Sequence, residues 1–183
     1  MMSNLNKWNR WYHDLSEPQA YGNTRTYQIG ADWLADCKVI EDWGCGKGWF
    51  STFVGPEQVY VGVDGSKTPY ATKQADLVDY QSTCDGLFMR HVLEHDPRWE
   101  VILFNAMQSF LHRMCLVLFT PLNEMGTTQI AWNDDPGVPD LSLGRHEIEA
   151  TIHLSGVEIC GSPQHLKTKT QYGEETVYLL EKR

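Results

Sequence analysis

Asp42-Trp43-Gly44-Cys45-Gly46-Lys47-Gly48 is the stretch of this 183-residue chain that decides its fold. It joins a predicted strand at 38–42 to a short predicted helix near 47–54. Glycines at such a junction adopt positive φ angles and let a ligand approach the backbone, and the start of a helix adds free N–H groups. The stretch therefore predicts a ligand site, with a tight turn that binds nothing as the alternative.

A second acid ends the next predicted strand. The run Val59-Tyr60-Val61-Gly62-Val63-Asp64 is nearly all apolar, which is typical of a buried parallel strand. Asp64 follows Asp42 by about 20 residues, a spacing at which a strand-end carboxylate can accept both hydrogens of a ribose diol. A nicotinamide-binding turn would read G-x-G-x-x-G, but its third glycine position is Trp49 here. The two motifs together favour a ribose-bearing ligand and argue against a nicotinamide oxidoreductase.

The rest of the chain alternates predicted strands with predicted helices. Helices are expected at 25–36 and 144–155, with a long one that begins at Asp96-Pro97 and carries His112 and Arg113 in its last turn. Further strands are expected at 75–77, 87–89, 115–120, 157–162 and 174–182, and residues 121–142 are predicted to be a loop. This alternation predicts an α/β fold with a mostly parallel sheet covered on both faces. The last two strands have no helix between them and are expected to form an antiparallel hairpin.

Several of these motifs resemble those of class I S-adenosylmethionine-dependent methyltransferases. The D-x-G-x-G-x-G stretch resembles their first motif, and the segments that resemble later motifs are 61–66, 75–77 and 85–95, the last ending in Val92-Leu93-Glu94-His95. The resemblance implies a minimal, Rossmann-like, doubly wound domain over residues 1–183. Its mostly parallel sheet would have seven strands and the antiparallel C-terminal hairpin. The spacing between Asp64 and Asp76 leaves room for only a short second helix, and the third is almost missing.

The resemblance also implies a cofactor, S-adenosyl-L-methionine, and the residues around it. Asp42, Gly44 and Gly46 are expected near its methionine end, Asp64 at the ribose, and Asp76 with Leu77 at the adenine. The further residues expected to bind the cofactor are Cys45, Gly65, Ser66 and Arg90. Because the adenine side is short, a shallow adenine pocket is expected.

Three histidines are candidate general bases, because histidine titrates near neutrality: His91, His95 and His146. Surface or helix-terminal positions are the alternative for each of them. His91 follows the fourth strand and is expected to face the methyl group.

The acceptor of the methyl group is expected to be a small molecule or the exposed end of a larger one, methylated on oxygen or nitrogen. DNA amino-methyltransferases carry N/D/S-P-P-Y/F where this chain has Met89-Arg90-His91-Val92, and no Pro-Cys pair of a cytosine C5 enzyme occurs. A module that binds the cofactor but has lost turnover is the alternative from another functional class.

Charge and composition disfavour bulk nucleic acid and membranes as partners and leave a local basic groove as the alternative. The formal charge is −9 and no basic run is longer than Lys182-Arg183, which disfavours bulk nucleic acid and anionic membrane surfaces. No apolar run approaches a membrane span. The five cysteines show no C-x-x-C spacing, which argues against zinc and favours a cytoplasmic protein with free thiols.

Two further features leave alternatives open. His91-Val92-Leu93-Glu94-His95 resembles the E-x-x-E-H motif of metal-dependent O-methyltransferases, but His91 replaces a carboxylate that Mg²⁺ prefers. We therefore predict no metal site and keep a metal-dependent O-methyltransferase as the alternative. The aromatic N-terminal segment 1–30 is expected either to cover the cofactor or to pack on the sheet as a helix through Trp8 and Trp11.

Overall fold

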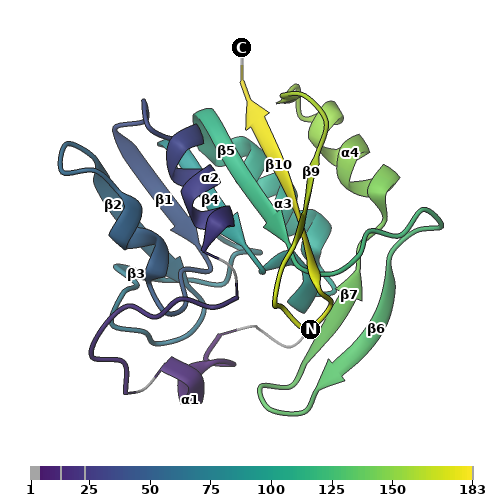
Figure 1. Cartoon of the computed structure of the whole chain (residues 1–183), viewed down its shortest axis with the longest axis horizontal. Helices are drawn as coiled ribbons and strands as arrows, with labels where there is room; N and C mark the ends of the chain where they lie inside the picture. Colours follow the sequence, from purple (N-terminus) through teal and green to yellow (C-terminus); the bar gives the residue numbers. More distant parts are fainter. Residues whose placement is uncertain (1–4, 13, 23, 183) are drawn as a thin grey trace.

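The computed structural model describes residues 5–12, 14–22 and 24–182, and its centre is an eight-stranded sheet (Figure 1). The parallel strands lie in the order β3 (Lys73–Gln74), β2 (Val59–Asp64), β1 (Val39–Trp43), β4 (Cys84–Arg90) and β5 (Phe110–Leu118). The antiparallel strands are β10 (Glu174–Glu181), which pairs with β5, and β8 (Glu158–Ile159) and β9 (Gln164–Lys167), which both pair with β10. The predicted Rossmann-like sheet is confirmed, with β9 adding an eighth strand.

Helices cover both faces of this sheet. The 3-10 helix η1 (Trp49–Phe53) and the helix α2 (Arg25–Trp33) pack on one face, and α3 (Trp99–Ser109) and α4 (Arg145–Leu154) pack on the other. In β4 the buried side chains alternate, so that Phe88 faces α2 while Leu87 and Met89 face α3. Both faces of β4 are inside the protein, which explains why its central residues Leu87, Phe88 and Met89 are all apolar.

The long helix differs from its prediction at both ends. It begins at Trp99 rather than at Pro97, and Asp96 Oδ1 instead accepts the backbone N–H of Arg98 at 2.8 Å. It ends at Ser109, so His112 and Arg113 lie in β5 and not in a helical last turn. The prediction was wrong because β5 is paired on both sides, with β4 and with β10, and this pairing overrides the helical periodicity of the segment.

A second sheet occupies part of the segment that was predicted to be a loop. Strands β6 (Thr128–Asn133) and β7 (Val138–Ser142) form an antiparallel hairpin, closed by Gly137 in the left-handed region with φ 78°. The hairpin packs through β7 against the short 3-10 helix η2 (Leu93–His95). The loop prediction failed because β6 is largely exposed and shows no clean alternation of apolar and polar residues.

The N-terminal segment lies at the edge where the parallel strands end, beside the β6–β7 hairpin (Figure 1). Its short helix α1 (Asn9–Tyr12) follows a turn held by the backbone N–H of Asn6, which donates to the carbonyl of Gly65 at 2.8 Å. The backbone N–H of Trp8 donates to Ser66 Oγ at 2.8 Å. Residues 1–4, 13 and 23 of the predicted segment 1–30 lie outside the described residues.

The segment after β2 differs from its prediction. The short second helix is absent, because no helix separates β2 from β3, and the third strand is two residues long, at 73–74 rather than 75–77. No helix separates β3 from β4 either, which agrees with the expectation that the third helix is almost missing. No helix in the described part of the chain is long and apolar enough to span a membrane.

Candidate functional site

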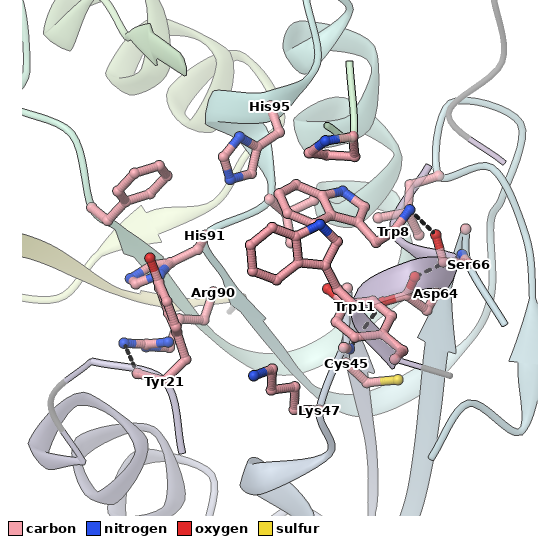
Figure 2. Close-up of a pocket in the computed structure, with 18 of the residues that line it drawn as sticks. Trp8, Trp11, Tyr21, Cys45, Lys47, Asp64, Ser66, Arg90, His91 and His95 are labelled. Carbon is pink, nitrogen blue, oxygen red and sulfur yellow. Dashed lines mark hydrogen bonds between the residues drawn. The ribbon is translucent and has the colours of Figure 1, made fainter. Parts of the chain in front are cut away.

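A cavity of about 360 Å³ opens at the carboxyl ends of the parallel strands, beneath the N-terminal segment. Most of the predicted site residues line it: Gly44, Cys45, Gly46, Asp64, Gly65, Ser66, Asp76, Leu77, Arg90, His91 and His95. Figure 2 shows the two histidines on one side of the cavity and Asp64 with Ser66 on the other. The sequence motifs thus converge on one place, as the topology of a parallel sheet requires.

Two predicted residues do not line the cavity. Asp42 is buried behind the glycine turn, where its Oδ2 accepts the hydroxyl hydrogen of Tyr60 at 2.8 Å. Burial raises the pKa of Asp42 to about 7. His146 is exposed on α4, where its Nε2 lies 3.8 Å from Glu124.

The glycine turn has the backbone conformation that its sequence predicts. Gly44 and Gly46 have φ angles of 77° and 45°, which side chains rarely adopt. A Cβ on Gly44 would collide with Val92, and one on Gly46 would lie 3.0 Å from the hydroxyl oxygen of Tyr12. Both positions therefore require glycine, and the phenol of Tyr12 lies against the cavity face of Gly46.

Asp64 fastens the glycine turn to the end of β2. One carboxylate oxygen accepts the backbone N–H of Gly46 at 2.9 Å, and the other accepts that of Ser66 at 2.7 Å. Burial raises the pKa of Asp64 to about 6, against the lowering effect of these two hydrogen bonds. Each oxygen keeps a lone pair for a further hydrogen bond.

Asp76 and Leu77 follow β3 at the far end of the cavity. The carboxylate of Asp76 accepts a hydrogen bond from Arg98 Nη2 at 3.4 Å. Leu77 is 7% exposed and is part of the core beneath the cavity. Asp76 and Leu77 therefore lie in a loop that follows the two-residue strand β3. This agrees with the short segment that was predicted on this side of the cavity.

The guanidinium of Arg90 is already engaged within the protein. Its Nη2 donates to Glu175 Oε1 at 2.8 Å and to the carbonyl of Tyr21 at 2.9 Å. Its Nε and Nη1 donate to Thr26 and Tyr27 at 3.1 and 2.9 Å. Because a guanidinium has five N–H donors, one remains for the cavity, and a contact between Arg90 and a cofactor stays a prediction.

His91 lies beside this ion pair in a strained conformation. Its φ is 58°, in the left-handed region, and its Nε2 is 3.3 Å from Glu175 Oε1. Burial, with the nearby charge of Arg90, lowers the pKa of His91 to about 3. The ring is therefore neutral at physiological pH.

His95 differs from His91 because its hydrogen-bond partners fix its tautomer. Its Nδ1 is 3.1 Å from the carbonyl oxygen of Pro139 and 3.2 Å from Asp140 Oδ1. A carbonyl and a carboxylate only accept hydrogen bonds, so Nδ1 carries the hydrogen and Nε2 has a free lone pair in the neutral ring. His91 and His95 both line the cavity and lie near a carboxylate. The ring nitrogens of His91 have no hydrogen-bond partner among the described residues, whereas Nδ1 of His95 is held by the carbonyl of Pro139.

Asp140 is held in turn by its own neighbours. Tyr172 Oη donates to Oδ2 at 2.8 Å, and Asn133 Nδ2 donates to Oδ1 at 2.7 Å. Burial raises the pKa of Asp140, but hydrogen bonds from His95, Tyr172 and Asn133 outweigh it and leave the pKa below its ordinary value. Sequence reasoning missed Asp140 because it lies on β7, inside the predicted loop, and no motif marks it.

Glu94 accepts a backbone hydrogen bond and does not line the cavity. It is fully buried, and its Oε1 accepts the backbone N–H of Phe119 directly after β5. Burial raises the pKa of Glu94 to about 7. Among the described residues no group of three or more His, Cys, Asp or Glu side chains is arranged to hold a metal ion. A metal-free reaction stays a prediction.

Comparison with known proteins identifies the fold. The sequence matches no protein-family model and has no significant match among curated proteins. The structure is similar to magnesium protoporphyrin IX methyltransferase from Synechocystis with bound S-adenosylmethionine, with a TM-score of 0.65 at 15% identity over 87% of this chain and 79% of that one.

Two further solved structures show the range of proteins that share this fold. The 1,6-didemethyltoxoflavin-N1-methyltransferase of Burkholderia thailandensis, solved with S-adenosylhomocysteine, gives a TM-score of 0.67 at 13% identity, over 95% of this chain and 81% of that one. The [4+2]-cyclase SpnF gives 0.64 at 11%, over 86% and 80%. At such identities the likeness establishes the fold alone. The chain has the fold of the class I S-adenosylmethionine-dependent methyltransferases.

Proposed function

We propose that this protein is an S-adenosylmethionine-dependent methyltransferase that acts on an oxygen or nitrogen atom of a small molecule or of an exposed end of a larger one. The observation that carries the proposal is a cavity with the glycine turn and Asp64 on one side and the free Nε2 of His95 on another. The proposal treats residues 1–183 as one catalytic domain that works in the cytoplasm.

The cofactor half of the cavity fits S-adenosylmethionine. Asp64 keeps one lone pair on each carboxylate oxygen, which suits the two hydroxyl groups of a ribose. Gly46 leaves the backbone open to a ligand, provided that the phenol of Tyr12 moves aside. Cys45, Gly65 and Ser66 complete this half, with Asp76 and Leu77 proposed at the adenine and Asp42 and Arg90 near the methionine end.

The acceptor half supplies a proton acceptor. When bound, the cofactor offers a methyl group on a sulfonium sulfur, which is already activated for displacement. His95 Nε2 takes the proton of the acceptor hydroxyl or amine, and Asp140 stabilises the imidazolium that forms. The acceptor atom forms the new bond to the methyl carbon, while the bond from that carbon to sulfur breaks and leaves its electron pair on sulfur. The chain therefore contributes orientation and proton removal.

Calorimetry with S-adenosylmethionine, S-adenosylhomocysteine and NAD tests the cofactor. We expect the first two to bind tighter than about 1 mM and NAD to bind more weakly. Gly46→Val should abolish this binding, because its side chain enters the face that approaches the cofactor. Gly161→Val is the matched control: Gly161 also has a positive φ, of 76°, but lies in open space. Equal binding by the two variants would contradict the proposed site.

Transfer of a radiolabelled methyl group to fractionated metabolites tests the reaction. Label should enter an organic-soluble or amine fraction, and His95→Ala should slow the transfer by about 10²-fold or more. Binding of S-adenosylhomocysteine without transfer to any fraction would favour the alternative, a module that binds the cofactor without turnover. The observation that favours this alternative is the structural similarity to a cyclase, because it shows that proteins with this fold are not all methyltransferases.

A further inference from the structure

Aromatic rings form a continuous wall on the acceptor side of the cavity. We call this wall the aromatic arc: Trp8, His95, Phe119, His91 and Tyr21, in spatial order. Neighbouring ring centroids are 5.1 Å apart from Trp8 to His95, 5.2 Å from His95 to Phe119, 4.8 Å from Phe119 to His91 and 5.9 Å from His91 to Tyr21. All five residues line the cavity. Such a wall favours a ligand that presents a flat, apolar surface.

The charges around the arc select against anions. The carboxylates that line the cavity are Asp64, Asp76, Asp135 and Asp140, of which Asp76 pairs with Arg98 and Asp135 with Arg10. The cations that line it are Lys47 and Arg90. Arg90 is paired with Glu175. Lys47 lies at the glycine turn, where its Nζ donates to Gln19 at 3.4 Å. Burial keeps the ring of His91 neutral. Of the described residues that line the cavity, Lys47 is the cation whose contact is a neutral amide, and it lies at the glycine turn rather than in the arc.

The ring of His95 offers a ligand an acceptor of hydrogen bonds. Because Nδ1 of His95 donates to Pro139 and Asp140, Nε2 accepts. A ligand that stacks on the arc would pair with this atom through a hydroxyl or N–H group. Trp8 and Phe119 flank His95 and would contact the ring that bears this group.

We infer that the acceptor is an uncharged aromatic molecule with a hydroxyl or N–H group, bound against the aromatic arc with that group on His95 Nε2. This inference rests on the proposed function, and it narrows the substrate class of the same site. It names Trp8 and Phe119 as specificity-determining residues.

Three matched probes test the inference by binding rather than by turnover. 2-Naphthol is flat and uncharged at neutral pH, decahydro-2-naphthol is its saturated counterpart, and 6-hydroxynaphthalene-2-sulfonate is its anionic counterpart. Each is titrated by calorimetry into the protein, with and without saturating S-adenosylhomocysteine. We expect 2-naphthol to bind about tenfold tighter than the saturated probe, from the loss of aromatic contacts. We expect it to bind about fivefold tighter than the sulfonate, from repulsion by the cavity carboxylates.

Variants then locate the probe. Phe119→Leu and Trp8→Leu should each weaken 2-naphthol binding about fivefold while leaving the affinity for S-adenosylhomocysteine unchanged. Trp132→Leu is the matched control, because Trp132 is exposed on β6 and does not line the cavity. Each variant is first checked for the far-ultraviolet circular dichroism spectrum of the parent protein.

Several outcomes would overturn the inference. These are no measurable 2-naphthol binding, equal affinity for the saturated probe, tighter binding of the sulfonate, or unchanged naphthol binding in both arc variants. Failure of the proposed function would look different, because S-adenosylhomocysteine would then not bind, or would bind without methyl transfer to any fraction. The titrations without S-adenosylhomocysteine still decide the substrate class in that case.

Discussion

Replacing Glu175 by alanine would leave the buried guanidinium of Arg90 without its carboxylate partner. The two side chains are 0% and 5% exposed, and Arg90 Nη2 lies 2.8 Å from Glu175 Oε1. Removing one member of a buried ion pair costs about 3–5 kcal/mol, because the remaining charge stays in a medium that solvates it poorly. For a chain of this size 1 kcal/mol corresponds to roughly 2–4 °C in Tm, so we expect Tm to fall by about 6–20 °C.

A double-mutant cycle measured by urea denaturation isolates the pair itself. Glu175→Ala and Arg90→Met should together cost less than the sum of the single changes by about 1–3 kcal/mol, because the double variant buries no unpaired charge. Glu100→Ala, at an exposed position on α3, is the control and should change stability by about 0.5 kcal/mol or less. A loss in Glu175→Ala no larger than in this control, or strict additivity in the cycle, would refute the reasoning.

The ion pair between Arg90 and Glu175 also makes the stability of the protein depend on pH. Burial raises the pKa of Glu175, but the close Nε2 of His91 and the charge of Arg90 outweigh burial and lower it. A carboxyl group whose pKa is lowered by folding stabilises the protein fully above its unfolded pKa, and the contribution is lost as pH falls through the folded pKa. The difference in stability between wild type and Glu175→Ala should therefore shrink on acidification.

Three more predictions concern the proposed reaction. Because the folded protein raises the pKa of Asp64 to about 6 and ribose binding needs the ionised form, affinity for S-adenosylhomocysteine should be about tenfold weaker at pH 5 than at pH 7. An affinity that does not change in calorimetry across this range would contradict that role. Asp140→Asn should lower kcat for methyl transfer about 10–100-fold, with KM changed less, while the exposed Asp134→Asn should not. Equal kcat in the two variants would mean that Asp140 does not position His95. Neither EDTA nor added Mg²⁺, Mn²⁺ or Zn²⁺ should change the rate by more than a few-fold, and loss in EDTA restored by one ion would reverse this prediction.

The side of the cavity that carries the glycine turn and Asp64 could be predicted because its information is local. Gly44 and Gly46 are required by their own φ angles, and Asp64 stands at the end of an apolar strand that any sequence pattern reveals. The topology of a parallel sheet then brings these residues together without knowledge of side-chain packing. The placement of His95 after the fourth strand follows from the same rule.

The acceptor half could not be predicted because its information is distant in sequence. Asp140 reaches His95 from a hairpin whose exposed first strand lacks a periodic pattern, and Glu175 reaches Arg90 from the last strand. Neither acid is marked by a motif, and each acquires its partner only through tertiary packing. The end of α3 was misplaced for the same reason, since pairing of β5 with two neighbours decides where the helix stops.

The hairpin that carries Asp140 is joined to the rest of the protein at a narrow base. Asn123 pairs with Gly144, its backbone N–H donates to the carbonyl of Leu143 at 2.8 Å, and its carbonyl accepts the N–H of Arg145 at 3.0 Å. The segment between these points leaves and re-enters the domain at one place. Its exposed strand β6 can therefore vary in sequence without displacing β5 or the glycine turn, whereas β7 is buried and adds Leu141 to the core. Variation in β6 and in the turn that follows it would change the part of the cavity lined by Asn133, Asp135 and Pro136 and leave the glycine turn unaltered.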